Sequence, residues 1–341
     1  MVTLTESTEE YIHVTAGSAQ DDVASMPEHC IDVTVVICTR NRAASLGRVL
    51  RSMAALKVPA RLRWELLVVD NGSQDDTPAV IASYGDQLPI VRLEEATPGL
   101  SNARNAGIRR AHGRYIVWTD DDVQLHEEWL AAYVEAFQQF PDAAVFGGTA
   151  LPILEEPTPA WFLEGQDELR GLLAHRDPRD FPRRLAVDGE LPYGLNFAVR
   201  TAEQRSHLYD PALGVAPGRR GGGEERQSIQ AMLAAGADGY WVPKAIVFHV
   251  IPPSRQTLEY VKLYYKAQGE VNAFLRELDG TKFGVPTLFN RGARATAHYL
   301  LYLLRRVTDG SAIWVRHFRR FSYEIGVIAY LTSSDRRSRQ R

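Results

Sequence analysis

Short apolar runs alternate with amphipathic segments along the first half of the chain. The runs predict buried strands, because near-continuous apolar stretches are typical of parallel strands covered on both faces; they lie at Val33–Cys38, Glu65–Val69, Ile90–Leu93 and Tyr115–Trp118. The segments that follow them predict helices at about 43–55, from 75 onward, at 99–111 and at 127–140. This alternation predicts a parallel α/β sheet with helices on both faces.

The second half of the chain has a less regular pattern. Residues 151–190 predict an irregular segment, and strand character returns at Leu195–Val199, Tyr240–Val242 and Ala245–Val250. Helices are expected at 224–235, 255–278, 291–307 and 311–331, with a linker over 279–290. Because residues 1–30 are polar and aperiodic, we divide the chain into a flexible arm (1–30), an α/β domain (31–252) and a basic amphipathic helical extension (253–341).

The overall composition narrows the function classes. A formal net charge of −3 over 341 residues gives no general argument for nucleic-acid binding. The two cysteines, Cys30 and Cys38, do not predict a disulfide framework, so we expect a reducing cytoplasm. The N-terminus lacks the basic and apolar regions of a signal peptide, and no apolar run is long enough to predict a membrane-spanning helix.

Positive charge gathers at the C-terminus. Residues 291–341 contain eleven Arg against three acidic residues, a local excess of eight positive charges, and large apolar residues lie among them. Two interpretations stay open for these helices: peripheral attachment to an anionic membrane on its inner face, or an amphipathic hairpin that packs on the core or forms a homodimer.

Three consecutive carboxylates, Asp120, Asp121 and Asp122, follow the strand at Tyr115–Trp118. Such like charges repel one another, and a divalent cation relieves the repulsion. Mg²⁺ and Mn²⁺ are commonly held by one or two carboxylates together with substrate phosphates. The run is therefore either a metal–diphosphate site or an exposed acidic turn before the next helix. Thr39–Arg42 and Asp70–Ser73 also end strands, so we expect the three loops to meet at the carboxyl edge of the sheet.

Five motifs in order resemble those of family 2 glycosyltransferases with the GT-A fold. They are Val33–Arg42, Leu66–Ser73, Ser101–Gly107, Tyr115–Asp122, and Gly222–Glu225 together with His249. The resemblance covers about 33–249 and implies a mixed, mainly parallel sheet with a nucleotide-sugar half (31–122) and an acceptor half (123–252). It also implies inverting transfer of a sugar from a nucleoside-diphosphate sugar to the hydroxyl of a saccharide, a lipid-linked sugar or a small molecule.

On this resemblance the cofactor is Mn²⁺ or Mg²⁺, and Asp122 is its main protein ligand. Asp120 would reach the donor ribose or a metal-bound water, and Asp121 would assist or shape the turn. His249 is either a further ligand of the metal or diphosphate, or a structural histidine, since imidazole suits Mn²⁺ less decisively than a carboxylate does.

The resemblance also implies a nucleotide-binding surface. Asp70 would accept a hydrogen bond from the donor base, which favours UDP- or dTDP-sugars, although an Asp before Asn-Gly is also a common turn former. Arg104 would orient an aspartate or a phosphate oxygen, with a surface ion pair as the alternative. Further nucleotide-sugar contacts would come from Thr39, Arg40, Asn41 and Asn71; the first three can also cap the following helix.

The attacking hydroxyl needs a general base, and Glu224 and Glu225 take the positions of the family's Glu-Asp pair. Glu225 stands at the base position, but Glu there departs from the family pattern, and acids decorating a helix N-terminus are the structural alternative. Arg255 is a candidate for contacting the diphosphate from a closing loop. Two other functions are weighed: a non-catalytic nucleotide- or sugar-binding relative, and a nucleotidyltransferase, which would normally have a Gly-rich basic loop in place of Thr39–Arg42.

Overall fold

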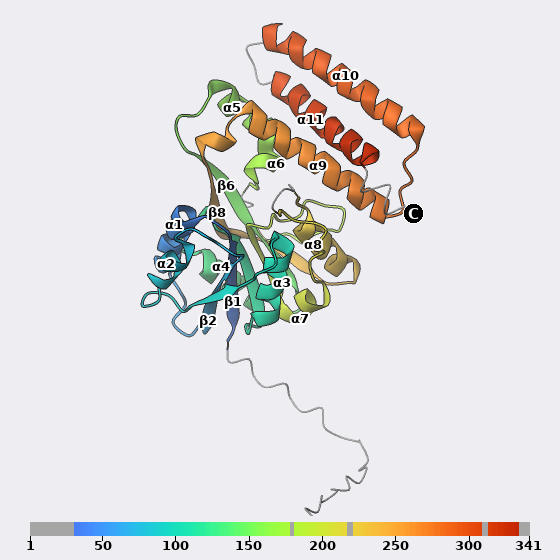
Figure 1. Ribbon diagram of the computed structural model, residues 1–341. Helices are drawn as coiled ribbons and strands as arrows, with labels where there is room; N and C mark the ends of the chain where they lie inside the picture. Colours follow the sequence, from blue (N-terminus) through green and yellow to red (C-terminus); the bar gives the residue numbers. More distant parts are fainter. Residues whose placement is uncertain (1–30, 178–180, 217–220, 309–312, 334–341) are drawn as a thin grey trace, which may run out of the picture.

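An eight-stranded sheet forms the centre of the molecule (Figure 1). The computed structural model describes residues 31–177, 181–216, 221–308 and 313–333, so the expected N-terminal arm lies outside the described residues. The strand order is β3-β2-β1-β4-β7-β6-β8-β5. The strands are β1 (Val33–Thr39), β2 (Trp64–Asp70), β3 (Ile90–Glu94), β4 (Tyr115–Asp120), β5 (Val123–Leu125), β6 (Val145–Leu154), β7 (Asn196–Arg200) and β8 (Gly239–Ile251).

The sheet is mixed, as the resemblance implied. Strands β3, β2, β1 and β4 are parallel, whereas β7 runs antiparallel to both β4 and β6. Strand β8 is parallel to β6 and antiparallel to β5. In the register of the parallel strands, Thr39 lies opposite Asp70 and Cys38 lies opposite Asp120. The loops after β1, β2 and β4 therefore leave the sheet at the same edge, where ligands of open α/β sheets bind.

Helices cover both faces of the sheet because strand residues alternate between two apolar clusters. Val35 packs on one face with α1 (Ala43–Ala54), α2 (Thr77–Ala82) and α4 (Trp129–Gln139). Val36 packs on the other face with α3 (Leu100–Arg110) and α8 (Glu224–Ala234). The short helix α7 (Thr201–Ser206) follows β7. Two-sided coverage is thus confirmed.

One largely buried carboxylate joins β2 to the loop before β4. Glu65 Oε1 accepts hydrogen bonds from Thr34 Oγ1 (2.7 Å) and from the backbone N–H of His112 (2.8 Å). Burial raises the pKa of the Glu65 carboxyl, but the hydrogen bonds from Thr34 and His112 outweigh it and bring the pKa below its ordinary value. The ionised form of Glu65 therefore stabilises the folded state.

The middle of the chain departs from the expectation. Strand β6 was not predicted, because Gly147, Gly148 and Pro152 interrupt its apolar pattern. The supposedly irregular residues 151–190 contain the end of β6, the helices α5 (Ala160–Glu164) and α6 (Arg170–Leu173), and a 3₁₀ turn (Gln166–Leu169). The two short strands expected after residue 239 form one strand, β8, whose pairing with β6 shifts register after Gly148. The three-residue β5, too short to show periodicity, was also missed.

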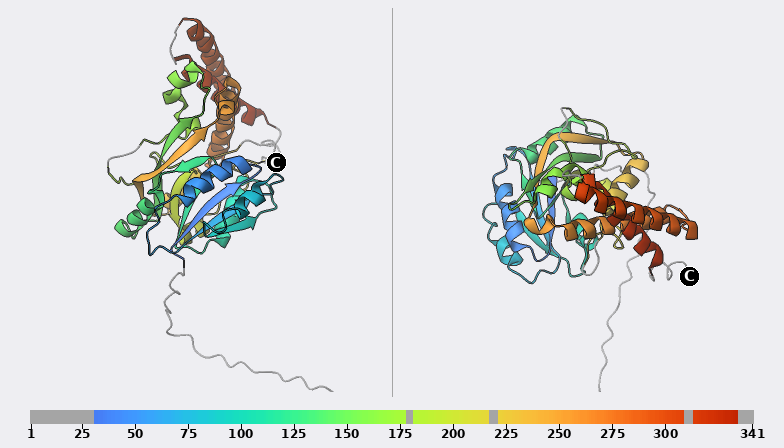
Figure 2. Two further views of the ribbon diagram at one scale, coloured as in Figure 1. Left: turned by 90° about the vertical axis from the view of Figure 1, so that its left-hand side faces the viewer. Right: turned by 90° about the horizontal axis from the view of Figure 1, so that it is seen from above.

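Three C-terminal helices lie in successive layers beside the sheet domain (Figures 1 and 2). Helix α11 (Ile313–Thr332) packs between α9 (Leu258–Leu278) and α10 (Val285–Thr308). The linker predicted over 279–290 is wrong from Val285 onward, because α10 begins there, with a proline in its first turn where proline is tolerated. Among the helices of the described residues, none combines the length and apolarity needed to cross a bilayer.

Two glycines allow α9 and α11 to cross closely. A Cβ added to Gly326 would lie 1.9 Å from the carbonyl oxygen of Lys266, and one added to Gly269 would lie 2.1 Å from that of Tyr323. Trp314 and Phe318 of α11 are buried in a cluster that includes Phe162, Leu172, Tyr265 and Tyr302. Helix α11 therefore packs against the rest of the chain, as one of the two interpretations of the C-terminal helices expected.

Candidate active site

The aspartates after β4 are surrounded by arginines. Asp122 Oδ2 lies 3.0 Å from Nη2 of Arg42 and 2.8 Å from Nη2 of Arg255, and Asp122 Oδ1 lies 3.8 Å from Nε2 of His249. Arg42 also pairs with Asp121 at 3.0 Å. Asp121 and Asp122 are 4% and 8% exposed. The interpretation of the run as an exposed acidic turn is therefore wrong for these two residues.

Neighbouring carboxyls in this run have opposite pKa shifts. Burial raises the pKa of Asp121 to about 7, although the charge of Arg42 and a 2.7 Å hydrogen bond from Thr39 Oγ1 lower it. Burial also raises the pKa of Asp122, but the contact with His249 and the charges of Arg255 and Arg42 outweigh it and hold this pKa well below its ordinary value. Asp122 is thus the carboxylate that stays ionised most readily.

The orientation of His249 is set by β8 and by the segment after α6. Its Nδ1 lies 2.9 Å from the carbonyl oxygen of Leu173. A carbonyl only accepts hydrogen bonds, so Nδ1 is the donor in this contact, and Nε2 is directed toward Asp122 and toward Arg255, whose Nη1 is 3.4 Å away. A histidine whose second nitrogen is held in this way has the arrangement usual for metal ligands.

Asp122 and His249 fit a divalent cation bound by two protein ligands. With Oδ1 and Nε2 3.8 Å apart, one ion at about 2.1 Å from each could contact both. The guanidinium of Arg255, itself a cation, contacts both side chains. Within the described ranges, no three His, Cys, Asp or Glu side chains gather closely enough to hold an ion. The remaining ligands would have to come from a substrate, as is common for Mg²⁺.

Arg104 joins the aspartate run to the N-terminus of α8. It is 3% exposed, and its guanidinium lies 3.6 Å from Asp120 Oδ1, 2.7 Å from Glu224 Oε1 and 3.7 Å from Glu225 Oε2. The alternative of a surface ion pair is therefore wrong. Burial disfavours the charge of Arg104, but the surrounding carboxylates outweigh it and raise its pKa, so Arg104 is a permanent cation beneath the site.

The two glutamates of α8 have different surroundings. Glu224 is 2% exposed, and its Oε2 is buried without a hydrogen-bond partner. Burial, followed by the charge of Glu225, raises the pKa of Glu224 to about 7. The Glu225 side chain is 19% exposed and more distant from Arg104. The chain reaches these residues through Gly222 and Gly223, whose φ angles of +150° and +82° favour glycine. Glu225 is the one of the pair that solvent reaches more easily.

Asp70 ends β2 with both carboxylate oxygens engaged. Oδ1 accepts from the backbone N–H of Ser73 (2.8 Å), and Oδ2 accepts from Nε and Nη2 of Arg92 at 3.1 and 2.7 Å. Burial raises the pKa of Asp70, but the hydrogen bonds from Ser73 and Arg92 outweigh it and lower the pKa. Because Oδ2 is shared with Arg92, a base contact at Asp70 would involve this Asp–Arg pair rather than the carboxylate alone.

The other predicted nucleotide residues tie the strand-end loops together. Arg40 Nη1 donates to the carbonyl oxygen of Asn71 (2.6 Å), and the backbone N–H of Asn41 donates to Ser73 Oγ (2.9 Å). The Asn71 side chain accepts from the backbone N–H of Gly99 (2.8 Å) and also donates to two carbonyls of the segment before α3. Whether these residues also contact a nucleotide stays a prediction.

Two arginines of the site were not singled out from the sequence. Arg42 lies inside a recognised motif, but its contacts with Asp121 and Asp122 bridge about eighty positions in the chain. The signal for Arg92 is a charged residue in the otherwise apolar run Ile90–Leu93. Such a residue on a short strand beside β2 could have been proposed as a partner of Asp70.

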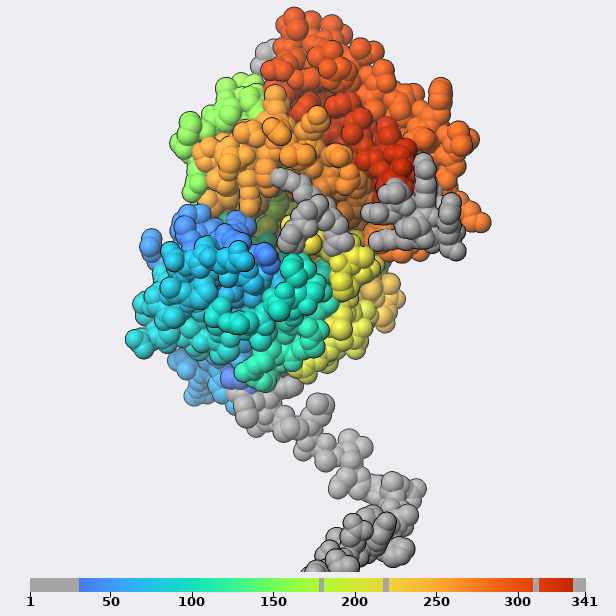
Figure 3. Space-filling model, viewed as in Figure 1, coloured from blue at the N-terminus to red at the C-terminus, as the bar shows by residue number. Residues whose placement is uncertain are grey.

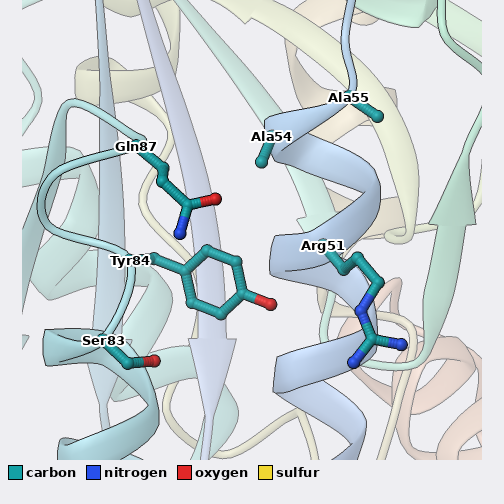
Figure 4. A pocket seen from close by; sticks show the side chains of 6 residues that line it. All are labelled: Arg51, Ala54, Ala55, Ser83, Tyr84 and Gln87. Carbon is teal, nitrogen blue, oxygen red and sulfur yellow. The ribbon is translucent and has the colours of Figure 1, made fainter.

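A separate pocket lies at the C-terminal end of α1, away from the aspartate run (Figure 4). It is lined by residues from the end of α1 and the segment between α2 and β3: Arg51, Ala54, Ala55, Ser83, Tyr84 and Gln87. Since α1 starts beside the carboxyl end of β1 and runs back along the sheet, this pocket is remote from the aspartate run. No carboxylate lines this pocket, and we assign it no part in sugar transfer.

Comparison with known proteins identifies related sequences and folds. Residues 34–181 match the family model of glycosyl transferase family 2. The succinoglycan biosynthesis protein ExoM of Rhizobium meliloti (strain 1021) is 26% identical over 243 residues, which cover 69% of this chain and 72% of that protein. The next curated relatives are matched over less than half of their own length.

Two solved structures share the fold. The mannosyltransferase PcManGT from Pyrobaculum calidifontis, in complex with GDP-Man and Mn²⁺, has a TM-score of 0.58 and 17% identity, covering 91% of this chain and 90% of that chain. S. aureus TarS 1–349 in complex with UDP has a TM-score of 0.51 and 14% identity, covering 91% of this chain and 92% of that chain. At these identities the likeness establishes the architecture.

Proposed function

We propose that this chain, whose residues 34–181 match the model of glycosyl transferase family 2, transfers a sugar, with inversion, from a nucleoside-diphosphate sugar to an acceptor hydroxyl. One observation carries the proposal. Buried Arg104 joins an aspartate run that is suited to a diphosphate–metal complex to a pair of glutamates that is suited to deprotonating an acceptor. In this proposal, donor and acceptor chemistry would take place on the two sides of a single guanidinium.

The base in this proposal is Glu225. Its carboxylate takes the proton of the acceptor hydroxyl as the hydroxyl oxygen bonds to the anomeric carbon, and the bond from that carbon to the diphosphate breaks with its electrons leaving on the phosphate oxygen. Glu225 is supported over Glu224 because it is the more exposed and lies farther from Arg104. Glu224 would act through Arg104, holding the guanidinium between the two halves of the site.

The donor diphosphate would lie against Asp122, Asp120 and the nearby arginines. When bound at Asp122 and His249, Mn²⁺ or Mg²⁺ would supply positive charge that neutralises the leaving diphosphate. Arg42 and Arg255, which pair with Asp122 in the structure, would contact phosphate oxygens through their guanidinium groups. Asp121, hydrogen-bonded by Thr39, would shape the turn that presents its neighbours.

The nucleobase would contact the pair formed by Asp70 and Arg92. Together they offer an acceptor and several donors at the end of β2. We propose a UDP- or dTDP-sugar as donor; TarS, which shares the fold, was solved with UDP, whereas PcManGT was solved with GDP-Man. Similarity to ExoM, a succinoglycan biosynthesis protein, supports a saccharide acceptor in polysaccharide or glycoconjugate synthesis.

The test is a calorimetric titration of the chain with UDP, dTDP, GDP and ADP, each with and without Mn²⁺. The proposal expects one diphosphate to bind with metal-enhanced affinity, and Asp122→Ala to remove the enhancement. Asp86→Ala, at an exposed position between α2 and β3, is the matched control and should bind as the wild type does. If no nucleoside diphosphate bound, the chain would be a non-catalytic relative. If a diphosphate bound with the same affinity without Mn²⁺ and in Asp122→Ala, the metal role would be refuted.

A further inference from the structure

The outward side of α10 carries an exposed apolar stripe. Helix α10 buries Ala295 and Tyr302 on the side that packs against α11. On the opposite side, positions separated by alternate steps of four and three residues form a continuous face along the helix. We define the outer stripe as its large members, Phe289, Leu300, Leu303, Leu304 and Val307, all of which are exposed.

The exposure of this stripe is large for apolar side chains. Leu300 is 60% exposed, Leu304 is 56% exposed and Val307 is 88% exposed. Helix α10 is the outermost layer of the helical extension, so its far side faces away from the rest of the chain (Figures 1 and 3). Contiguous apolar surface of this kind marks an interaction site more often than scattered single residues do.

A positive flank runs beside the stripe. Helix α10 contains four arginines and no Asp or Glu, and Arg294 lies on its side with a 60% exposed side chain, although it also reaches Glu324 of α11. Arg320 of α11 is exposed, and its charge acts on His298 and His317, whose Nδ1 atoms are 3.2 Å apart. Burial and then the charge of Arg320 lower the pKa of both histidines. The flank is therefore electropositive.

The charges discriminate between two partners for the stripe. In a pair formed by α10 helices of two copies, arginines would meet arginines, since neither helix offers a carboxylate. An anionic bilayer surface complements both features, because acyl chains accept the leucines while headgroups attract the arginines. The excess of eight positive charges over 291–341 strengthens the same attraction.

We propose that α10 is a peripheral membrane helix, which lies along an anionic bilayer surface with its outer stripe inserted among the lipids. Of the two interpretations of the C-terminal helices, packing on the protein then applies to α11, and attachment to a membrane applies to α10. The inference needs no donor or acceptor, so it stands or falls independently of the proposed transfer.

The experiment is co-sedimentation of the whole chain with vesicles of phosphatidylcholine alone or mixed equally with phosphatidylglycerol. We expect binding to the mixed vesicles, weak binding to neutral ones, and a marked loss at high salt. Leu300→Gln with Leu304→Gln should lower the partition coefficient roughly ten-fold or more, with an unchanged circular dichroism spectrum, because both side chains are already exposed. The control Leu208→Gln, at a 50% exposed leucine of the sheet domain, should leave partitioning unchanged.

Three outcomes would overturn the proposal. Wild-type protein could fail to sediment with the anionic vesicles, or the double variant could sediment as well as the wild type. Analytical ultracentrifugation without lipid could also show a dimer that the double variant dissociates, which would assign the stripe to a second copy.

Discussion

Removing the charge of Arg104 should destabilise the fold strongly and in a pH-dependent way. Arg104→Met leaves Glu224 2% exposed, without its 2.7 Å partner and with Oε2 already unpaired. Breaking one side of a buried ion pair costs about 3–5 kcal/mol, because the remaining charge is left uncompensated. Because Glu224 can take up a proton, which limits the loss, we expect Arg104→Met to lower the free energy of unfolding at pH 8 by at most about that amount.

The pH dependence follows from the pKa of Glu224. In the folded protein this pKa is already raised to about 7 from an ordinary value of 4.5, chiefly by burial. The folded state therefore binds a proton more tightly than the unfolded state, and the stability contributed by this group falls as pH rises from about 4.5 to 7. Without Arg104 the pKa rises further, so the penalty of Arg104→Met should shrink when the pH is lowered to 6.

Urea unfolding followed by tryptophan fluorescence measures the effect, with Trp118 as a nearby reporter at 6.0 Å from the Arg104 guanidinium. Adding Glu224→Gln to Arg104→Met should recover a large part of the loss, because it removes the buried charge. Arg109→Met is the control on the same helix; with a side chain 61% exposed it should change stability by less than about 0.5 kcal/mol. The reasoning is refuted if Arg104→Met costs under about 1 kcal/mol, or if Glu224→Gln recovers none of it.

Three other predictions concern the base, a buried carboxylate and the helical extension. Glu225→Gln should keep the fold but slow release of nucleoside diphosphate from the donor by a factor of roughly 10²–10⁴; activity close to wild type would exclude Glu225 as the base. Glu65 has a lowered pKa in the folded state, so its ionised form stabilises the protein above about pH 4.5 and that stability is lost as pH falls. Glu65→Gln should therefore lower the urea midpoint more at pH 7 than at pH 3.5, and an equal effect at both values would contradict this. Gly326→Ala should cost about 1–3 kcal/mol or more and expose the extension to limited proteolysis, because its Cβ meets a backbone carbonyl of α9; the control Gly292→Ala, with open space around it, should stabilise α10 slightly, and similar behaviour of the two would refute the close crossing.

Local pattern determined much of the sheet domain. The apolar runs that end at Cys38, Val69 and Trp118 are β1, β2 and β4, extended by one or two residues at their carboxyl ends. Strands buried on both faces need such runs, so they are readable without tertiary information. Strand β6 could not be predicted from its local pattern, because its glycines are required by close packing against distant residues. A Cβ on Gly148 would lie 2.2 Å from Nδ2 of Asn196.

The sequence by itself also predicted that the loops after β1, β2 and β4 meet, because motifs that end neighbouring parallel strands lie at one edge of the sheet. Tertiary structure decided how each residue there behaves. Asp121 and Asp122 are adjacent in sequence, yet their pKa values shift in opposite directions, since His249 and Arg255 approach only one of them. Packing between distant segments likewise decides that Glu225 is more exposed to solvent than Glu224. It also decides which face of α10 is exposed. Burial and charge pairing are properties of such long-range contacts, and a local pattern does not contain them.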